Sequence, residues 1–256
     1  MDEENFALSK SKQIQEKFKS LNLRFNRIED LINNKTQAQT IQQDFGHDPT
    51  SHRDAVGGMW EEIGRLQFNF LVDQGLKPDM QLVDIGCGSL RGGVHFIKYL
   101  HSENYYGIDI NSDLIKAGYE QELNPELREK CPQKNLLVND QFKVSLFQHK
   151  FDFALAQSVF THLPLNSIRR CLLELDKSMK PMGKFYATFF EVSSSQDWIK
   201  PCHHEPGGIV TYPDKDPYHY HQSDFLWCIQ DSSWKMDSIG DWQHPRAQKM
   251  LVFTKT

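Results

Sequence analysis

The sequence has no apolar run long enough to span a membrane and no recognisable signal-peptide pattern. Its five cysteines are scattered and form no CxxC pair, which argues against a disulfide framework and against structural zinc. Lysine and arginine never occur in runs of more than two, and the formal net charge is -5. A polyanion such as nucleic acid is therefore disfavoured as a substrate. We expect a cytoplasmic protein with reduced thiols and with neither a membrane nor a nucleic-acid partner.

The length of 256 residues, of which 39% are hydrophobic, suits one large α/β domain with an appendage. We assign residues 1–35 to an N-terminal amphipathic helix, 36–51 to a polar linker and 52–256 to the main domain. Apolar residues of the helix are spaced four and three apart in alternation, at Ile14, Phe18, Leu21, Phe25, Ile28 and Ile32. This heptad seam predicts a coiled coil and hence a homo-oligomer. A helix docked on its own domain is the alternative, because Leu23 and Leu31 widen the apolar stripe.

A strand, a glycine turn and a helix are predicted between residues 81 and 100. The apolar run 81–85 ends at Gly86 and Gly88, and a helical pattern resumes at 94–100. A second apolar run contains Asp109 about 20 residues beyond the glycines, where such folds place the carboxylate that binds a ribose. The pattern therefore predicts a nucleoside ligand.

The spacing of the glycines indicates which nucleoside. A dinucleotide fingerprint has its third glycine three residues after the second, but Arg91 occupies that position and Gly92 follows one residue late. Asp84, two residues before Gly86, suits a ligand with a cationic amino group better than one with a phosphate. S-adenosylmethionine carries a ribose, an ammonium group and no phosphate. A nicotinamide-dependent oxidoreductase is the disfavoured rival, since the sequence also lacks a Tyr-x-x-x-Lys pair.

These residues follow the first motif of the class I S-adenosylmethionine-dependent methyltransferases, which the chain resembles from about residue 81 onward. It departs from that motif at Leu90, where many members have another glycine. The resemblance implies a Rossmann-like α/β fold with a seven-stranded, mostly parallel sheet whose last strand is antiparallel. It also implies S-adenosylmethionine as the cofactor, bound by residues at the strand ends: Asp84, Gly86, Gly88, Asp109, Ile110, Asn139, Asp140, Gln157 and Ser158.

The segment 157–164, which follows a fourth apolar run at 151–156, is a second match to this family. Members commonly carry a Ser here and then a His and a Leu or Met before a Pro, as in Ser158, His162 and Leu163. The Asn/Asp-Pro-Pro-aromatic signature of enzymes that methylate the amino groups of bases or planar amides is absent from this segment. The segment therefore favours transfer of the methyl group to oxygen.

His162 is the predicted general base, because an imidazole can accept a hydroxyl proton near neutral pH. Glu191 follows the predicted fifth strand, 184–190, and is predicted to orient that imidazole or to bind substrate hydroxyls. A purely structural role is the alternative for both residues.

Residues 192–222 form a long connection that is too aromatic for a disordered segment. We predict a lid over a sugar, whose apolar face stacks on aromatic rings while its hydroxyls bond to imidazoles. The predicted substrate-binding residues are His203, His204 and Tyr220 of the lid, with Trp60 from the helix before the first strand. The four histidines of the lid could instead hold a metal ion, but they form no compact ligand motif, and no metal is expected.

A narrower resemblance covers residues 52–191, which look like O-methyltransferases of bacterial surface-polysaccharide clusters. Some of these enzymes methylate nucleotide-linked heptoses, so a nucleotide-linked sugar is the implied substrate, for capsule or another surface polysaccharide. A methyltransferase of another small natural product and a non-catalytic, oligomerising cofactor-binding protein are the alternatives.

Overall fold

The computed structural model describes residues 51–193 and 198–256. The predicted N-terminal helix of residues 1–35, and with it the predicted coiled coil, lies outside the described residues, as does the linker up to residue 50. No helix within the described ranges is both long enough and apolar enough to cross a bilayer.

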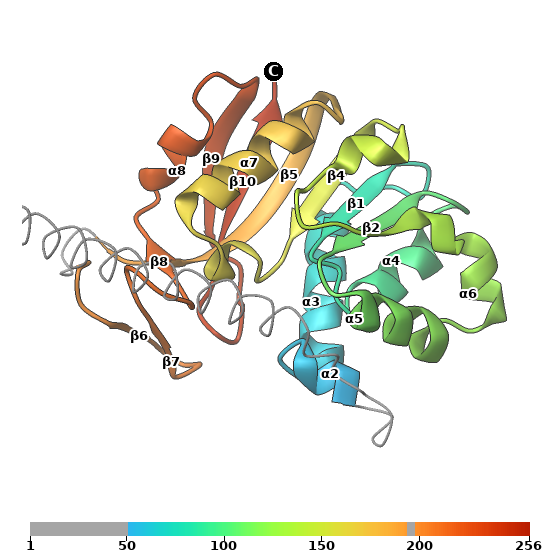
Figure 1. Ribbon diagram of the computed structural model, residues 1–256, viewed down its shortest axis with the longest axis horizontal. Coiled ribbons are helices and arrows are strands. Elements are labelled where there is room, and N and C mark those ends of the chain that lie inside the picture. Colours follow the sequence, from blue (N-terminus) through green and yellow to red (C-terminus); the bar gives the residue numbers. More distant parts are fainter. Residues whose placement is uncertain (1–50, 194–197) are drawn as a thin grey trace, which may run out of the picture. The chain divides into compact units, whose positions relative to one another are not determined.

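An eight-stranded sheet organises the described chain (Figure 1). Seven strands lie in the order β3-β2-β1-β4-β5-β10-β9, and β8 pairs with the end of β5. The first five of these strands are parallel, while β10 is antiparallel to both of its neighbours. The predicted mostly parallel sheet with an antiparallel last strand is therefore confirmed, and β8 is an addition to it. The strands are β1 (Leu82–Ile85), β2 (Tyr105–Asp109), β3 (Leu136–Val138), β4 (Phe151–Ala156), β5 (Met179–Glu191), β8 (His219–Tyr220), β9 (Trp234–Asp241) and β10 (Lys249–Lys255).

Helices cover both faces of the sheet (Figure 1). The core residues divide into one cluster with α7 and α8 and another with α3, α4 and α6. Because side chains alternate along a strand, Phe185 and Phe189 of β5 belong to the first cluster and Tyr186 to the second. The helices are α2 (Ser51–Ala55), α3 (Trp60–Asp73), α4 (Gly93–Tyr99), α5 (Ser112–Ala117), α6 (Pro125–Lys130), α7 (Leu165–Asp176) and α8 (Asp224–Cys228). Single turns are η1 (Gly118–Glu122), η2 (Gln133–Asn135), η3 (Val144–Phe147) and η4 (Phe160–His162).

The lid carries its own small hairpin, in which β6 (Cys202–His204) pairs antiparallel with β7 (Ile209–Thr211). After the hairpin the chain returns to the main sheet through β8, which pairs with Phe190 and Glu191 of β5. The lid is thus attached to the carboxyl end of a central strand.

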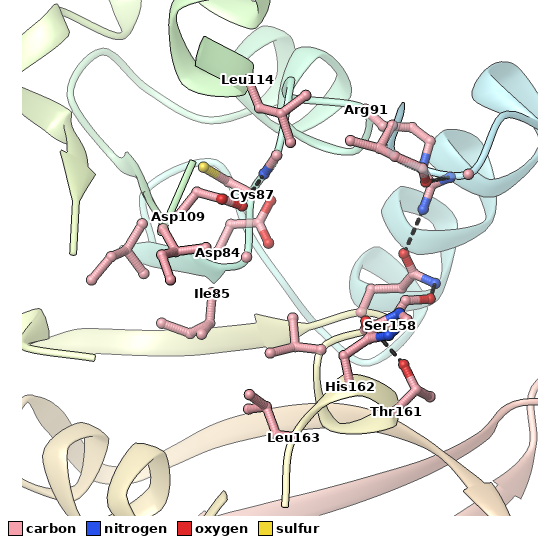
Figure 2. A pocket seen from close by; sticks show the side chains of 18 of the residues that line it. Asp84, Ile85, Cys87, Arg91, Asp109, Leu114, Ser158, Thr161, His162 and Leu163 are labelled. Carbon is pink, nitrogen blue, oxygen red and sulfur yellow. Dashed lines mark hydrogen bonds between the residues drawn. The ribbon is translucent and has the colours of Figure 1, made fainter. Parts of the chain in front are cut away.

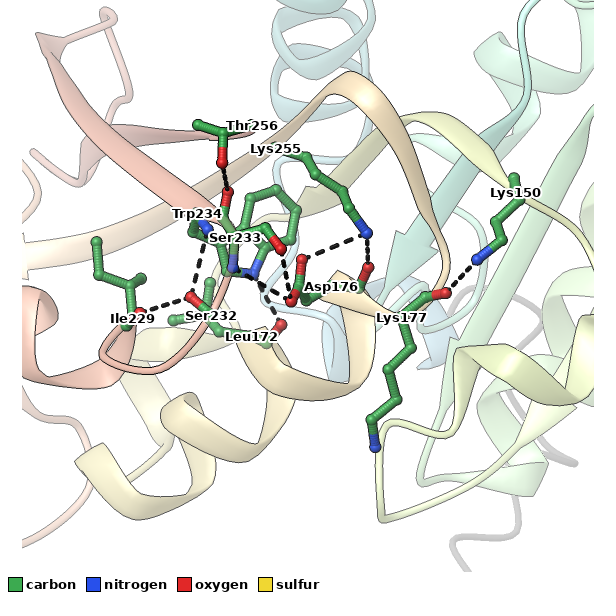
Figure 3. Close-up of polar contacts among 10 residues, drawn as sticks. All are labelled: Lys150, Leu172, Asp176, Lys177, Ile229, Ser232, Ser233, Trp234, Lys255 and Thr256. Carbon is green, nitrogen blue, oxygen red and sulfur yellow. Dashed lines mark hydrogen bonds and ion pairs between the residues drawn. The ribbon is translucent and has the colours of Figure 1, made fainter.

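A polar cluster ties α7 to the two antiparallel strands (Figure 3). Asp176, at the end of α7, accepts hydrogen bonds from the backbone and hydroxyl groups of Ser233 at 3.3 and 3.4 Å, and it lies 3.4 Å from the ammonium of Lys255. The indole of Trp234 donates to the carbonyl of Leu172 at 2.8 Å. The Asp176 and Lys255 side chains are only 19% and 17% exposed, so solvent screens this ion pair weakly.

Removal of the Lys255 ammonium should leave Asp176 as a mostly buried carboxylate without its cation. We expect Lys255→Met to lower the free energy of unfolding by about 1–3 kcal/mol, measured by chemical denaturation. Lys177→Met is the matched control, because Lys177 pairs with Glu174 on the surface, where such a pair contributes roughly 0–1 kcal/mol. Equal losses in the two variants would contradict a structural role for the Asp176 cluster.

Candidate functional site

A cavity of about 600 Å³ opens at the carboxyl ends of β1, β2, β3 and β4 (Figure 2). The strand order runs in one direction from β1 to β3 and in the other from β4 to β9, so the cavity lies where the order reverses. Open α/β sheets bind their ligands at this place, because the loops on either side diverge there. Figure 2 shows residues of the glycine turn and of the loop after β4 around the same cavity.

The glycine turn lies against β2. The backbone amides of Gly86 and Cys87 both donate to the carbonyl of Ile108, at 2.7 and 3.1 Å. Gly86 and Gly88 have φ values of 71° and 50°, which L residues rarely adopt, and a Cβ on Gly86 would lie 2.5 Å from a methyl group of Val159. Leu90, the departure from the family motif, itself has a φ of 69°. The turn therefore keeps a left-handed residue at this position without a glycine.

Two carboxylates, the buried Asp84 and the half-buried Asp109, line the cavity beside this turn. Asp84 accepts a hydrogen bond from the Tyr105 hydroxyl at 2.8 Å, and burial raises the pKa of Asp84 to about 7. Asp109 accepts the amides of Gly88 and Asn111, each at 2.8 Å, and burial raises its pKa despite these bonds. A carboxylate has about four acceptor positions, so Asp109 can accept further hydroxyl donors.

The ends of β2 and β3 supply an apolar and a polar wall. Ile110 is 69% exposed and lines the cavity, as do Asn139 and Asp140. The side-chain oxygen of Asn139 accepts the amides of Gln141 and Lys143, at 2.9 and 3.0 Å, and so closes the turn after β3. Asp140, which follows Asn139, is exposed, and its carboxylate is available to a ligand.

A hydrogen-bond network continues from the predicted residues Gln157 and Ser158, both of which line the cavity. The Gln157 side-chain oxygen accepts from Arg91 at 2.8 Å and from Gln67 at 3.3 Å. The Ser158 hydroxyl is bonded to Gln248, whose side-chain oxygen also accepts from the Thr188 hydroxyl. Sequence reasoning missed Gln67, Arg91, Arg246 and Gln248 as lining residues, although Arg91 lies inside the glycine motif.

The α5 helix begins just after Asp109, and Asn111 is its N-cap. The Asn111 side chain accepts the amides of Asp113 and Leu114. This cap places the Asn111 backbone amide on Asp109, so the helix start helps to hold the carboxylate.

His162 ends the η4 turn after β4 and lines the cavity. Its Nδ1 lies 2.6 Å from Oδ1 of Asp216, which comes from the lid. Glu191, the predicted partner, is not among the residues that line the cavity, and it pairs with Tyr220 of β8 at the end of β5. Asp216, which was not predicted, is the carboxylate in contact with His162.

The predicted substrate-binding residues His203, His204, Tyr220 and Trp60 also do not line the cavity. His203 is exposed. The ring of His204 bonds to the Thr211 hydroxyl at 2.8 Å, and burial lowers its pKa to about 4. The Tyr220 hydroxyl donates to the carbonyl of Leu163 at 2.6 Å, and Trp60 packs beneath the guanidinium of Arg53. His204 and Tyr220 thus hold the lid together and to the loop after β4, while Ile209 and Pro217 line the cavity.

The histidines of the lid likewise form structural bonds. His219 shares the Thr211 hydroxyl with His204 and bonds to the carbonyl of Trp198, both at 2.8 Å. Within residues 51–193 and 198–256, no group of three or more His, Cys, Asp or Glu side chains is placed to hold a metal ion.

Residues 83–185, which form most of the cavity, match the family model for a methyltransferase domain. The chain has a Rossmann-like methyltransferase fold. Magnesium protoporphyrin IX methyltransferase of Synechocystis PCC 6803, solved with S-adenosylmethionine bound, is similar with a TM-score of 0.51 and 14% identity, over 76% of this chain and 81% of that one. An amino pentose methyltransferase of Micromonospora echinaspora, also solved with S-adenosylmethionine, is similar with a TM-score of 0.54 and 13% identity, over 80% of this chain and 95% of that one. A putative O-methyltransferase of Nostoc punctiforme is similar with a TM-score of 0.57 and 14% identity, over 81% of this chain and 60% of that one.

The glycine turn of this methyltransferase fold should not tolerate a side chain at residue 86. We expect Gly86→Ala to cost roughly 1–2 kcal/mol for the left-handed backbone and a further roughly 1–3 kcal/mol for the clash with Val159. Gly240→Ala is the control, because Gly240 has a φ of 75° and nothing within 4 Å of an added Cβ. Denaturation of both variants measures the difference, and an equal loss of stability would show that Val159 moves aside at no cost.

Proposed function

We propose that this protein is an S-adenosylmethionine-dependent O-methyltransferase whose acceptor is a hydroxyl of a nucleotide-linked sugar, such as a heptose destined for capsule or another surface polysaccharide. The observation that carries the proposal is the contact between His162 and Asp216 at the edge of the cavity. It places a proton acceptor beside the carboxyl end of β4, where the ligands of such sheets bind.

The cavity residues fit S-adenosylmethionine. Asp109 suits the two ribose hydroxyls, and the buried carboxyl of Asp84 suits the ammonium group, whose charge would favour the ionised acid. Ile110 offers an apolar surface to the adenine ring and Asp140 an acceptor for its amino group. When bound, this cofactor supplies an electrophilic methyl group on a sulfonium.

In this proposal His162 accepts the proton of the acceptor hydroxyl, and Asp216 orients the His162 ring. Asp216 accepts the hydrogen bond of the Nδ1–H, which leaves the Nε2 lone pair of His162 to accept the proton of the sugar hydroxyl. S-adenosylmethionine held by Asp84, Asp109, Ile110 and Asp140 would supply the methyl group to the deprotonated hydroxyl oxygen and would leave as S-adenosylhomocysteine. The imidazolium that results is stabilised by the Asp216 carboxylate, and alignment of the oxygen with the methyl group supplies the rest of the acceleration.

The environment of His162 supports a sugar acceptor. Phe190, Ile209 and Pro217 give this part of the cavity an apolar surface against which a sugar ring can pack. Arg170 lines the cavity on α7 and offers a cation to the phosphates of a nucleotide. The amino pentose methyltransferase among the similar structures is an enzyme of the same fold that acts on a sugar.

Self-association through the heptad seam of residues 14–32 is part of the same proposal, and it rests on the sequence pattern alone. It would place two or more catalytic domains in one particle without a change in the chemistry of each.

Incubation of the protein with S-adenosylmethionine and a panel of nucleotide sugars, followed by mass spectrometry, tests the substrate class. We expect one nucleotide sugar to gain a single methyl group that survives the mild acid treatment which cleaves the nucleotide. If calorimetry shows no binding of S-adenosylmethionine, the protein is a non-catalytic scaffold. Methylation of another class of small molecule, with no sugar methylated, would overturn the assignment of a nucleotide-linked sugar as the acceptor.

The same assay tests the base. His162→Ala should lower kcat by about 10²- to 10⁴-fold, the range expected for loss of a general base, while cofactor affinity stays unchanged. Asp216→Asn should lower kcat less and shift the pH profile, since it removes only the group that fixes the imidazole. Glu191→Gln is the comparison and should retain most of the activity. A larger loss in Glu191→Gln than in Asp216→Asn would restore Glu191 as the orienting carboxylate.

A further inference from the structure

Ser158 lies at the start of the loop after β4 with a backbone conformation that a serine rarely adopts. Its φ is 58°, in the left-handed region, although the residue carries a Cβ. Such a conformation costs free energy, so it persists only where the surroundings hold it. The loop continues through Val159 to His162, and all three residues line the cavity. Whatever holds Ser158 therefore sets the direction of the loop that carries the proposed base.

Two buried side chains from neighbouring strands hold this residue. Thr188 lies within β5, and Gln248 directly precedes β10. The Ser158 amide donates to the Thr188 hydroxyl at 2.7 Å, and that hydroxyl donates in turn to the Gln248 side-chain oxygen at 2.7 Å. The Gln248 side-chain nitrogen donates to the Ser158 hydroxyl at 2.9 Å, which closes a ring of three residues. Thr188 is fully buried and Gln248 is only 3% exposed, so bulk water does not compete for these bonds.

The Ser158 hydroxyl makes all of its hydrogen bonds within the protein. It accepts from the side-chain nitrogens of Gln248 and Gln157, at 2.9 and 2.6 Å, and it donates to the Gln248 oxygen at 3.0 Å. A serine hydroxyl has one donor and two acceptor positions, so none is left for a ligand. The contribution of Ser158 to the site therefore comes from its backbone conformation.

The backbone of Ser158 also begins a chain of bonds that leads to the lid. Its carbonyl accepts from the Thr161 hydroxyl at 3.0 Å (Figure 2), and the Thr161 carbonyl accepts from the Tyr218 amide at 2.7 Å. Thr161 is fully buried and directly precedes His162. Tyr218 follows two residues after Asp216, whose carboxylate contacts His162. Both sides of the contact between His162 and Asp216 are thus attached to Ser158 through Thr161.

We propose that Thr188 and Gln248 are positioning residues for the reaction: they hold Ser158 in its left-handed backbone conformation and thereby set where His162 meets Asp216. The inference rests on the proposed role of His162 as the base. Thr188 is not among the residues that line the cavity, so it affects the reaction only through the loop after β4. Displacement of a reacting group by about 1 Å can lower a rate about 100-fold, so loss of the Thr188 hydroxyl should be visible in kcat.

Kinetics with the nucleotide sugar that the wild-type protein methylates test the assignment. Thr188→Val keeps the volume but leaves the Ser158 amide without its acceptor, and we expect kcat to fall about 10- to 100-fold. Thr188→Ser keeps the hydroxyl and should recover most of the wild-type kcat. Lys255→Met, which lowers stability at the other end of β10, is the matched control and should keep the wild-type kcat below its melting temperature.

A comparison of two backgrounds at residue 158 shows whether Thr188 acts through the backbone. Ser158→Ala and Ser158→Gly both remove the hydroxyl, but only glycine adopts the left-handed region freely. Added to Ser158→Ala, Thr188→Val should still lower kcat about 10- to 100-fold, whereas added to Ser158→Gly it should lower kcat less than about 3-fold. Equal losses in the two backgrounds would overturn the proposal.

Hydrogen exchange of the same proteins tests the positioning without any substrate. In Thr188→Val we expect faster exchange of the backbone amides in residues 158–163 and 212–218 than in the wild-type protein, with no change there in Lys255→Met. If the wild-type protein methylates no sugar, the proposed function is wrong, and exchange alone decides whether Thr188 holds the loop and the lid.

A role in stability alone gives a different set of results. If Thr188→Val lowers the melting temperature but changes neither kcat nor the exchange of these two segments, the positioning role is wrong. Gln248→Met, which removes the other partner of the Thr188 hydroxyl, replaces Thr188→Val in both measurements if that variant does not fold.

Discussion

The hydrogen bond from the Gly88 amide to the Asp109 carboxylate joins the glycine turn to the end of β2, and the site depends on it. With the two amides that donate to the Ile108 carbonyl, it fixes the path of the chain between β1 and α4. That path has left-handed residues at Gly86, Gly88 and Leu90, a conformation with a free-energy cost that the surrounding bonds offset. Because α4 begins directly after the turn, the same bonds set the position of Arg91 against the cavity.

The cavity concentrates charge that the rest of the core avoids. Asp84 and Arg91 are buried near each other, and the buried His244 bonds to the side chain of Gln157 and to the backbone amide of Arg246. Groups of this kind cost free energy in the unliganded protein, because each has lost its water without gaining a full set of partners. A ligand that bonds to Asp84 and Arg91 would supply partners that the unliganded protein lacks.

Several polar side chains in the described part of the lid hold it in place. The Thr211 hydroxyl joins His204 and His219, and the backbone amide of Tyr218 donates to the Thr161 carbonyl at 2.7 Å. Tyr220 adds a bond to Leu163. These contacts attach the lid to the loop that carries His162, and they bring Asp216 to that imidazole across 54 residues of sequence. The contact between His162 and Asp216 therefore depends on how the lid packs.

The sequence by itself determined the glycine turn and the cavity-lining residues of the strand ends, and its resemblance to the class I methyltransferases implied the mostly parallel sheet with an antiparallel last strand. The strand order came from the structure. Apolar runs, paired glycines and terminal acids are local patterns, and Asp84 and Asp109 follow directly from them. Asp140, Ser158 and His162 were placed at the site by the resemblance to the family, and all three line the cavity. Only the tertiary structure decided which distant side chains reach the cavity. Trp60, His204 and Tyr220 have side chains that could bind a sugar. Each instead contacts another part of the protein: Trp60 the Arg53 guanidinium, His204 the Thr211 hydroxyl and Tyr220 the Leu163 carbonyl. Arg246 and Asp216 lie in connections without a motif, and their place at the site depends on how β10 and the lid pack, because long-range packing leaves no periodic signal in the sequence.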